Sequence, residues 1–481
     1  MKKLRALPAW CYLALFALAL HLVNLGQESL WYDESFTAYL AKLDFVHMLQ
    51  AIQGDVHPPL WYVIEWITVR LFGSSEFALR LPAALLGTVA VLLTYRLSLL
   101  LSPDKRIALL AGFLAAILPG SLYYSQDARM YPLLAVLVIL MAITAIKGKW
   151  LFFALFAAGA LYTQNLAIIY VAVIGLTGAA IHIRNPYQAI GPVWSAIGIF
   201  AAWLPWLPTV FDQLHNVGSG FWIQPLTPGG VVYPMILLSG WRLPDFMQAP
   251  ILTSLMTFSI LSLVVFIRRP LATRAGKVIL ATIIAVPLAL VVISLLWRSV
   301  YLYRFLLPSA LTMCIPLAYA FFNLRLKTQR QLTAALVAPI LLAGVFFHYF
   351  PAHNAREDLR SFAAQISQAW HPGDVIYYVS LDTTLVMNYY LPGLPYAMYP
   401  HASNLNQALS AETRSAMNLI ELDWSDLKSS GYARAWVIAA DNGFLTADQG
   451  IEIVRLEALP HQTIDYYHKG FITQEILLVQ L

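Results

Sequence analysis

Two carboxylates stand side by side early in a chain that otherwise avoids charge. In the segment "WYDESFTAYLA", Asp33 and Glu34 follow a long apolar run. A carboxylate can take a proton from a reacting hydroxyl, and its neighbour can orient it or the reactant. Further along, "QGDVHPPLW" places Asp55 and His57 just before two prolines, which favour the first turn of a helix. An imidazole beside the free amides of a helix start is suited to contacting an anion.

Two more segments contribute arginines. "SQDARMYPLL" holds Asp127, Arg129 and Tyr131 in a short turn between apolar runs, and "YLYRFLLPSAL" holds Arg304 directly before another apolar run. A guanidinium forms strong, charge-assisted hydrogen bonds with phosphate. A basic residue deep in a membrane span costs about 2.5 to 3.5 kcal/mol on insertion scales. Arg304 therefore indicates either a specific partner or a side chain that reaches to the membrane surface.

Each segment also has an ordinary structural explanation. Asp33 can cap a following helix and Glu34 can favour its dipole, together worth about 1 kcal/mol. His57 can be a surface cap. Arg129 can form a local ion pair in its turn, while the tyrosines nearby form an interfacial aromatic belt. The segments must therefore be judged together, on the elements that position them.

The composition places these residues in a membrane protein. The chain has 481 residues, of which 59% are hydrophobic and only 11% are charged, and its mean hydropathy is +0.66. Soluble domains are about 25% charged. The basic N-terminus precedes an apolar run that is longer than a signal-peptide core, which predicts an uncleaved first span. The two cysteines, Cys11 and Cys314, fall inside predicted spans and indicate neither a disulfide nor a metal site.

About eleven membrane-spanning helices are predicted, because a span needs about 20 mostly apolar residues. They cover approximately residues 7–25, 81–101, 106–124, 131–147, 149–166, 167–183, 189–210, 250–267, 278–297, 304–323 and 331–350. Basic residues cluster at alternate span ends, which the positive-inside rule assigns to the cytoplasm. The N-terminus is then cytoplasmic, and all four polar segments lie on the outer face. The formal net charge of +5 requires no nucleic-acid partner.

The long outer loop, residues 26–80, is predicted to hold two amphipathic helices. In the first, Phe36, Tyr39, Leu40 and Leu43 recur at helical spacing, which favours a helix lying on the membrane surface with its apolar face down. In the second, the helical stripe after the prolines consists of Leu60, Ile64, Ile67 and Leu71.

Residues 351–481 form a separate region after the membrane domain of residues 1–350. An amphipathic helix, a Pro-Gly turn and a short strand begin it, and "ARAWVIAAD", "IEIVRLEAL" and "ITQEILLVQL" read as further strands. We therefore predict an extracytoplasmic α/β domain. It carries no nucleophile elbow, phosphate loop or metal-spaced cluster, so a supporting or recognition role is favoured over catalysis.

Taken together, the four outer segments combine proton acceptors with phosphate-binding groups at the lipid boundary. An anionic lipid headgroup arriving through the membrane would meet the arginines, and an acceptor hydroxyl arriving from outside would meet Asp33. This combination suits glycosyl transfer from a polyprenyl-phosphate sugar.

The four segments, in this order and on this topology, resemble the bacterial members of the dolichyl-phosphate-mannose protein mannosyltransferase superfamily, the GT-C class of family 39. The resemblance covers roughly residues 1–350. It implies a polytopic α-helical GT-C fold in a bacterial inner (plasma) membrane, and an inverting glycosyltransferase. The expected partners are a polyprenyl-phosphate sugar donor, membrane lipid and a hydroxyl acceptor on a glycolipid, a cell-envelope polysaccharide or a protein.

The resemblance also implies roles for individual residues. Asp33 would be the general base, and Glu34 would orient Asp33 or the acceptor. Arg304, with Arg129 as second candidate, would bind the donor phosphate, and His57 would add a hydrogen bond to it. Further substrate contacts are expected from Asp127, Tyr131 and Asp55.

Other possibilities stay open at this stage. No cofactor is expected, although Asp33, Glu34, His57 and Asp127 offer ligand types that a divalent metal can use. A lipid or sugar transporter or flippase is the main alternative, but the chain shows no convincing internal repeat. A second alternative is a non-catalytic envelope assembly protein that acts through its tail.

Overall fold

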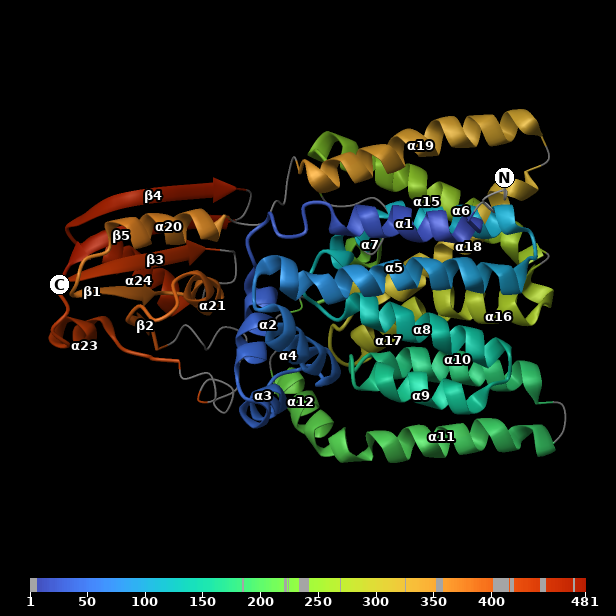
Figure 1. The fold of residues 1–481 in the computed structure, drawn as a ribbon, viewed down its shortest axis with the longest axis horizontal. Coiled ribbons are helices and arrows are strands. Elements are labelled where there is room, and N and C mark those ends of the chain that lie inside the picture. The colour runs from blue at the N-terminus through green and yellow to red at the C-terminus, as the bar shows by residue number, and fades with distance from the viewer. Residues whose placement is uncertain are drawn as a thin grey trace, which may run out of the picture.

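A computed structural model of the chain describes residues 7–183, 186–219, 223, 225–232, 242–268, 270–324, 326–351, 358–400, 415, 419–441, 447–469 and 472–481. It consists of a bundle of apolar helices and a smaller tail that combines helices with one sheet (Figure 1). The N-terminal end lies at the end of the bundle far from the tail (Figure 1). The predicted combination of a helical membrane protein with a C-terminal α/β unit is confirmed.

The bundle is built from apolar helices joined by short connections. Its elements are α1 (Ala9–Leu22), α5 (Glu76–Leu101), α6 (Lys105–Ile117), α7 (Pro119–Ser125), α8 (Tyr131–Ile146), α9 (Trp150–Leu161), α10 (Ala167–His182), η1 (Pro186–Ala189), α11 (Ile190–Trp203), η2 (Leu204–Trp206), α12 (Leu207–Ser219), α13 (Pro228–Val232), α15 (Asp245–Arg268), η4 (Pro270–Ala272), α16 (Arg274–Leu280), η5 (Ala281–Ala285), α17 (Val286–Leu296), η6 (Tyr303–Leu306), α18 (Leu307–Asn323) and α19 (Lys327–Tyr349).

The lengths of these helices agree with a multi-pass membrane protein. Within the described residues, six helical segments are long and apolar enough to cross a bilayer, and the pair α6 and α7, bent by 59°, makes a possible seventh. Four further apolar helices, α1, α8, α9 and α10, are shorter. Each of the eleven predicted spans coincides with one of these helices or pairs. The bend follows from Pro119, which opens α7 and cannot continue the hydrogen bonding of α6.

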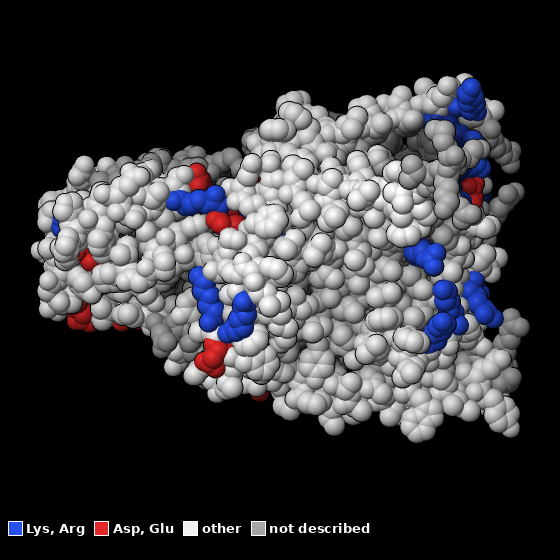
Figure 2. Space-filling view, viewed as in Figure 1, with Lys and Arg blue, Asp and Glu red and all other residues white. Residues whose placement is uncertain are grey.

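The surface of the bundle is apolar where lipid would cover it. On the face shown in Figure 2, charged side chains gather toward the two ends of the bundle, and the surface between them is almost free of charge. Large apolar side chains are exposed along α9, α11 and α19; Leu151, for example, is 81% exposed and Leu336 is 69% exposed. In water such a surface would be unfavourable, whereas in a bilayer it is the ordinary condition.

Three helices lie between α1 and α5, namely α2 (Tyr32–Lys42), α3 (Phe45–Gln53) and α4 (Leu60–Phe72). The prediction that the first of them lies on the membrane surface is wrong. Both faces of α2 are covered, because α4 packs on one side and α21 (Leu381–Tyr390) of the tail packs on another. Phe36 and Leu40 are buried in this arrangement.

The predicted stripe of α4 is also not its buried face. Ile67 and Leu71 are exposed, whereas the residues packed inside are Trp61, Tyr62 and Glu65, together with Thr68. Because the apolar stripe of a membrane protein can face lipid, the side of α4 that meets the protein is the more polar one.

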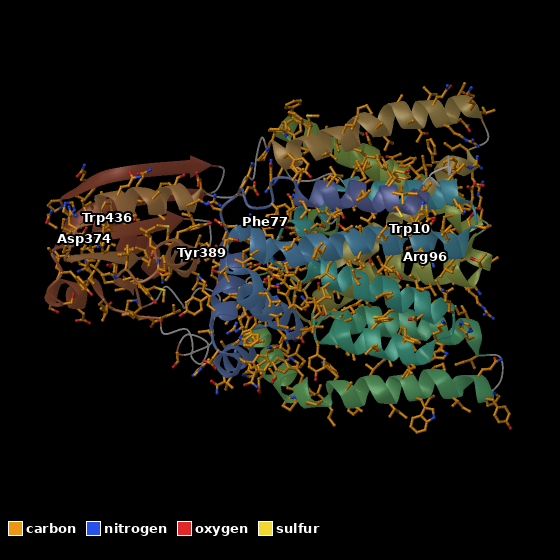
Figure 3. All side chains as sticks on the ribbon, viewed as in Figure 1. Trp10, Phe77, Arg96, Asp374, Tyr389 and Trp436 are labelled. Carbon is orange, nitrogen blue, oxygen red and sulfur yellow. The ribbon has the colours of Figure 1, made fainter. Side chains whose placement is uncertain are left out.

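The tail contains a five-stranded sheet in the order β2-β1-β3-β5-β4. Its elements are α20 (Leu359–Ala369), β1 (Asp374–Tyr378), α21 (Leu381–Tyr390), β2 (Tyr396–Met398), α23 (Trp424–Ser429), β3 (Arg434–Asp441), α24 (Ala447–Glu457), β4 (His461–Lys469) and β5 (Ile472–Gln480). The strand β1 pairs in parallel with β2 and β3, whereas β5 runs antiparallel to β3 and β4. The Trp436 indole donates to Asp374 at 2.9 Å and ties β3 to β1 (Figure 3).

Two of the three later predicted strands of the tail are confirmed. "ARAWVIAAD" contains β3 and "ITQEILLVQL" contains β5. "IEIVRLEAL" is instead part of helix α24, and β4 follows it. Glu452 and Leu456 of this helix are buried and lie four residues apart, which is a helical spacing.

Candidate active site

Asp33 lies in the first turn of α2 and faces two arginines from distant parts of the chain. Its Oδ2 accepts a hydrogen bond from Arg304 Nη1 at 3.1 Å and lies 3.8 Å from Arg129 Nε. The Asp33 side chain keeps 19% of its surface exposed, so an incoming group can reach it. The alternative that Asp33 caps the helix is wrong, because the N-cap residue is Trp31 and the Asp33 carboxylate bonds Arg304 instead.

Arg129 is held in the turn between α7 and α8 and is almost fully buried. Its Nη1 lies 3.3 Å from the carbonyl oxygen of Asp33, 3.4 Å from Thr37 Oγ1 and 3.4 Å from Tyr62 Oη. Its Nη2 lies 3.3 Å from His57 Nε2. The guanidinium therefore joins α2, α4 and the loop before α4 around the Asp33 carboxylate.

Asp55 and His57 form a second layer behind Arg129. His57 Nδ1 lies 2.9 Å from Asp55 Oδ2, so the ring donates there and its Nε2 accepts from Arg129. Burial opposes ionisation of Asp55, but the contacts with His57 outweigh it and hold the pKa of the carboxyl below its ordinary value. This arrangement does not favour the expected hydrogen bond from His57 to phosphate, because His57 Nε2 already contacts Arg129. Asp55 and His57 instead orient that arginine.

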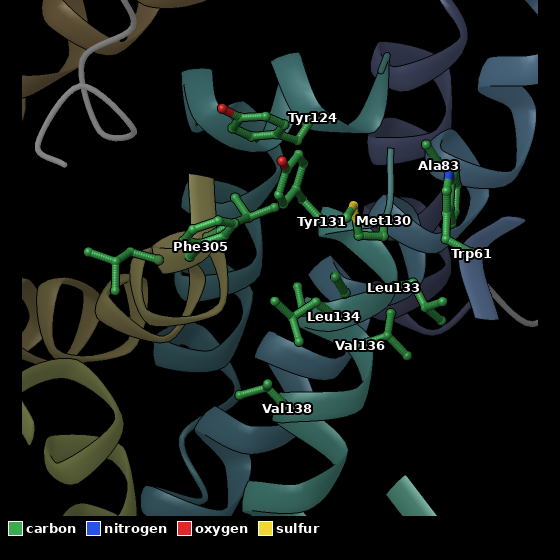
Figure 4. Packing of buried hydrophobic residues seen from close by; sticks show 14 of the residues in the cluster. Trp61, Ala83, Tyr124, Met130, Tyr131, Leu133, Leu134, Val136, Val138 and Phe305 are labelled. Atoms are coloured by element: carbon green, nitrogen blue, oxygen red, sulfur yellow. The ribbon is translucent and has the colours of Figure 1, made fainter. Parts of the chain in front are cut away.

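Arg304 approaches Asp33 along a cluster of aromatic rings. It lies in η6, and its guanidinium sits over the ring of Tyr131, 5.9 Å from the ring centre. Tyr131 in turn packs against Tyr124 and Phe305, with ring centres 4.8 Å and 6.4 Å away (Figure 4). Tyr131 is fully buried, and its hydroxyl has no hydrogen-bond partner within the described part of the chain. It therefore does not belong to an interfacial belt, and its ring supports Arg304.

Glu34 faces away from Asp33 and forms a buried ion pair with Arg80. Arg80 Nε donates to Oε1 at 2.8 Å and Nη2 donates to Oε2 at 2.7 Å, while the amide of Ala128 also donates to Oε1 at 2.9 Å. The two side chains are at most 2% exposed. The expectation that Glu34 orients the acceptor directly is not supported by this burial. Glu34 instead ties α2 to α5 and to the turn that carries Arg129.

Asp127 is likewise a structural part of this turn. Its side chain is fully buried, and Oδ1 accepts from the Trp31 indole at 2.8 Å. The Trp61 indole donates to the carbonyl oxygen of Ala128 at 3.1 Å. The sequence predicted that Asp127 contacts the substrate directly, and this burial does not favour such a contact. The turn is fixed from both sides, by α2 and by α4.

Several residues of the site were not singled out from the sequence. Arg80 is one of them, and a charged side chain four residues into an apolar helix is the signal by which it could have been found. Thr37 and Tyr62 are ordinary helical residues by pattern. Glu65 is fully buried, and its carboxyl oxygens lack hydrogen-bond partners among the described residues. Burial, reinforced by the charge of Glu34, raises the pKa of Glu65 well above its ordinary value.

The four candidate metal ligands named from the sequence are dispersed over separate contacts. Asp33 bonds arginine, Glu34 bonds Arg80, His57 bonds Asp55, and Asp127 bonds Trp31. The described part of the chain offers no group of three or more histidine, cysteine or acidic side chains placed to hold a metal ion. What the arrangement offers is a partly exposed carboxylate next to fixed guanidinium groups.

Comparisons with known proteins bear on the family and the fold. The model of the dolichyl-phosphate-mannose-protein mannosyltransferase family matches residues 56–207. The crystal structure of ArnT from Cupriavidus metallidurans in the apo state is 14% identical, with a TM-score of 0.63, and covers 97% of this chain and 98% of that chain. The structure of the same protein bound to undecaprenyl phosphate is 15% identical, with a TM-score of 0.63 and coverage of 98% of both chains. None of the curated proteins matches the sequence.

The matched family segment contains His57 and Arg129, whereas Asp33 and Arg304 lie outside it and are joined to it only by the fold. The likeness to ArnT extends over the bundle and the tail alike. The family model confirms the expected resemblance over residues 56–207, and the likeness in fold to ArnT extends over nearly the whole chain. The glycosyltransferase interpretation is favoured over the transporter. The chain is therefore a multi-pass membrane protein with the GT-C glycosyltransferase fold, and over residues 56–207 it is similar to the protein mannosyltransferases.

Proposed function

We propose that this protein is an inverting glycosyltransferase that moves a sugar from a polyprenyl-phosphate donor to an acceptor hydroxyl. The observation that carries the proposal is the partly exposed Asp33 carboxylate, held 3.1 Å from Arg304 and 3.8 Å from Arg129. A base and a phosphate-binding group are thereby adjacent. The ArnT structure with undecaprenyl phosphate supports a lipid phosphate of this kind as the donor carrier.

The proposed reaction needs one base and one anion-binding site. The acceptor oxygen attacks the anomeric carbon while its proton passes to Asp33. The bond from that carbon to the phosphate oxygen breaks, and the polyprenyl phosphate leaves with the bonding electrons. Arg304, with Arg129 behind it, stabilises the charge that grows on the phosphate. Because the attack comes from the face opposite the leaving group, the anomeric configuration inverts. The leaving phosphate is already an anion, so no strong general acid is required.

Donor binding and base release are coupled in this proposal. Arg304 bonds Asp33, and a donor phosphate would compete for the same guanidinium. Arg129 is kept in place by His57 and Tyr62 when Asp33 changes partner. No metal ion takes part in the proposed steps.

The acceptor and the location complete the proposal. The acceptor is a glycolipid, a cell-envelope polysaccharide or a protein, each of which presents a hydroxyl group. The N-terminus lies in the cytoplasm of a bacterium, and the site and the tail lie on the outer side of the inner membrane. The separation of the N-terminal end from the tail along the bundle supports this orientation (Figure 1).

The test is a transfer assay with the purified full-length protein in detergent. Radiolabelled polyprenyl-phosphate hexoses and pentoses are incubated with a membrane extract as acceptor source, and labelled product is separated from donor. We expect one donor to be consumed by the wild type and to persist with Asp33→Asn. Consumption of no donor, equal rates for the two proteins, or movement of donor without a new glycosidic bond would each contradict the proposal.

A further inference from the structure

The segment of residues 23–31 joins α1 to α2 and ends two residues before Asp33. Ser29 and Leu30 in this segment are buried, so their backbone groups need partners within the protein. Arg80 of the bundle donates to three carbonyl oxygens of the chain here, those of Leu25, Glu28 and Ser29. The membrane domain thus provides hydrogen-bond donors for three backbone carbonyl groups of the segment.

The tail provides hydrogen-bond partners for other backbone groups of the same segment. Tyr390 Oη accepts the amide hydrogen of Leu30 at 2.8 Å and donates to Glu76 Oε1 at 3.0 Å. Arg360 Nη2 donates to the same Glu76 oxygen at 2.6 Å. It also lies 3.2 Å from the carbonyl oxygen of Gly26 and 3.4 Å from that of Glu28. Two helices of the tail, α21 through Tyr390 and α20 through Arg360, therefore reach the backbone that leads into the candidate base.

Further contacts fasten this junction. The Ser29 hydroxyl donates to Asp358 Oδ1 at 3.3 Å and accepts from the amide of Arg360 at 3.3 Å. Tyr389, beside Tyr390 on α21, donates to the carbonyl oxygen of Ser74 at 2.6 Å. Figure 3 shows Tyr389 on the side of the tail that faces the bundle, and Figure 1 shows α21 next to α2. The tail thus binds the rest of the protein at two kinds of place. Tyr390 contacts the segment that leads to Asp33, whereas Tyr389 contacts Ser74, outside that segment.

From these contacts we infer that Tyr390 is a positioning residue for the reaction, through its bond to the Leu30 amide three residues before Asp33. The inference rests on the proposed function and assigns the tail a part in it. Without the Tyr390 hydroxyl, the buried Leu30 amide loses its acceptor, and the segment must move to find another. Displacement of a catalytic group by about 1 Å can cost about a hundredfold in rate. The tail thereby contributes to catalysis without touching the substrate.

The neighbouring tyrosines provide a matched pair of variants. Tyr390→Phe removes the hydroxyl that binds Leu30, whereas Tyr389→Phe removes a hydroxyl from the same helix that binds Ser74, outside the segment. We expect Tyr390→Phe to lower kcat by about ten- to hundredfold. Its KM for the donor should stay close to that of the wild type, because both arginines are intact. Tyr389→Phe should keep kcat within about twofold of the wild type, since Asp33 stays in position.

A second measurement does not depend on activity. Amide hydrogen exchange of the peptide that contains Leu30 should be faster in Tyr390→Phe than in the wild type, and unchanged in Tyr389→Phe. A wild type that transfers no sugar would overturn the proposed function. The exchange data would still test the contact between Tyr390 and the Leu30 amide. Unchanged exchange in Tyr390→Phe, unchanged kcat in that variant, or equal losses of kcat in the two variants would overturn the inference.

Discussion

Replacing Asp33 by asparagine should lower the rate of sugar transfer but raise the affinity for the donor. Asparagine keeps the shape of the side chain but neither accepts the proton as a carboxylate does nor carries its charge. Transfer should fall by about 10² to 10⁴, the usual contribution of a general base. The donor should nevertheless bind more tightly, because Arg304 no longer has to leave a carboxylate in order to contact phosphate.

The size of the binding effect follows from the contact that is lost. A hydrogen bond between charged groups contributes about 1.5 to 3 kcal/mol. The side chains of Arg304 and Asp33 are 14% and 19% exposed, and asparagine retains a neutral acceptor, so the free energy gained lies around the lower end of this range. A gain of about 1 to 2 kcal/mol corresponds to a factor of about 5 to 30 in the dissociation constant.

The assay is a titration of the detergent-solubilised protein with undecaprenyl phosphate, followed by intrinsic tryptophan fluorescence. Asp44→Asn serves as the control, because Asp44 is an exposed carboxylate in the same outer segment that caps α3. It should leave the affinity unchanged. The gain for Asp33→Asn should also shrink at high salt, since screening weakens partly exposed charges. Equal or weaker affinity in Asp33→Asn would refute the idea that Asp33 and phosphate share Arg304.

Three further predictions concern the charged groups around Asp33. Arg304→Ala should weaken undecaprenyl phosphate binding by about ten- to hundredfold through loss of a charged hydrogen bond, and an unchanged affinity would move the phosphate role elsewhere. Glu34→Gln should destabilise the protein by about 3 to 5 kcal/mol in thermal unfolding, because it leaves Arg80 buried without its counter-charge; a change below about 1 kcal/mol would contradict this. Burial holds the pKa of Glu65 in the folded protein well above its ordinary value of 4.5, so its contribution to stability falls as pH rises above that value. The stability of Glu65→Gln relative to wild type should therefore rise with pH above 4.5, by up to about 1.4 kcal/mol per pH unit, and a constant difference would contradict the raised pKa.

The meeting of the four polar segments was predictable because topology alone brings them to one face. Asp33 and Arg304 are 271 positions apart, yet both were expected at outer ends of spans, and the structure joins them by a hydrogen bond. The division of labour within the acidic pair was not predictable. Nothing in the local pattern distinguishes Asp33, which faces Arg304, from Glu34, which faces Arg80, because their directions depend on helices that pack around α2.

Local periodicity failed for two helices, α4 and α24. On α4 the apolar positions Ile67 and Leu71 are exposed and the inward side carries Tyr62 and Glu65, so the apolar stripe is not the face that packs on the protein. In α24 the alternation of apolar and polar residues imitates a strand. The buried positions follow a helical repeat that a short segment cannot reveal by itself.

The ion pair of Glu34 with Arg80 has a consequence for how sequences of this kind can diverge. Loss of either partner leaves an uncompensated charge in the interior, whereas replacement of both by apolar residues of similar size can be nearly neutral. Related chains should therefore keep the two residues together or lose them together. Asp33 is partly exposed and is shared by two arginines, so it has no single partner with which it would be kept or lost. In the proposed mechanism the two adjacent residues are thus under different constraints. Asp33 is needed for the reaction, and Glu34 is needed to pair with Arg80 in α5.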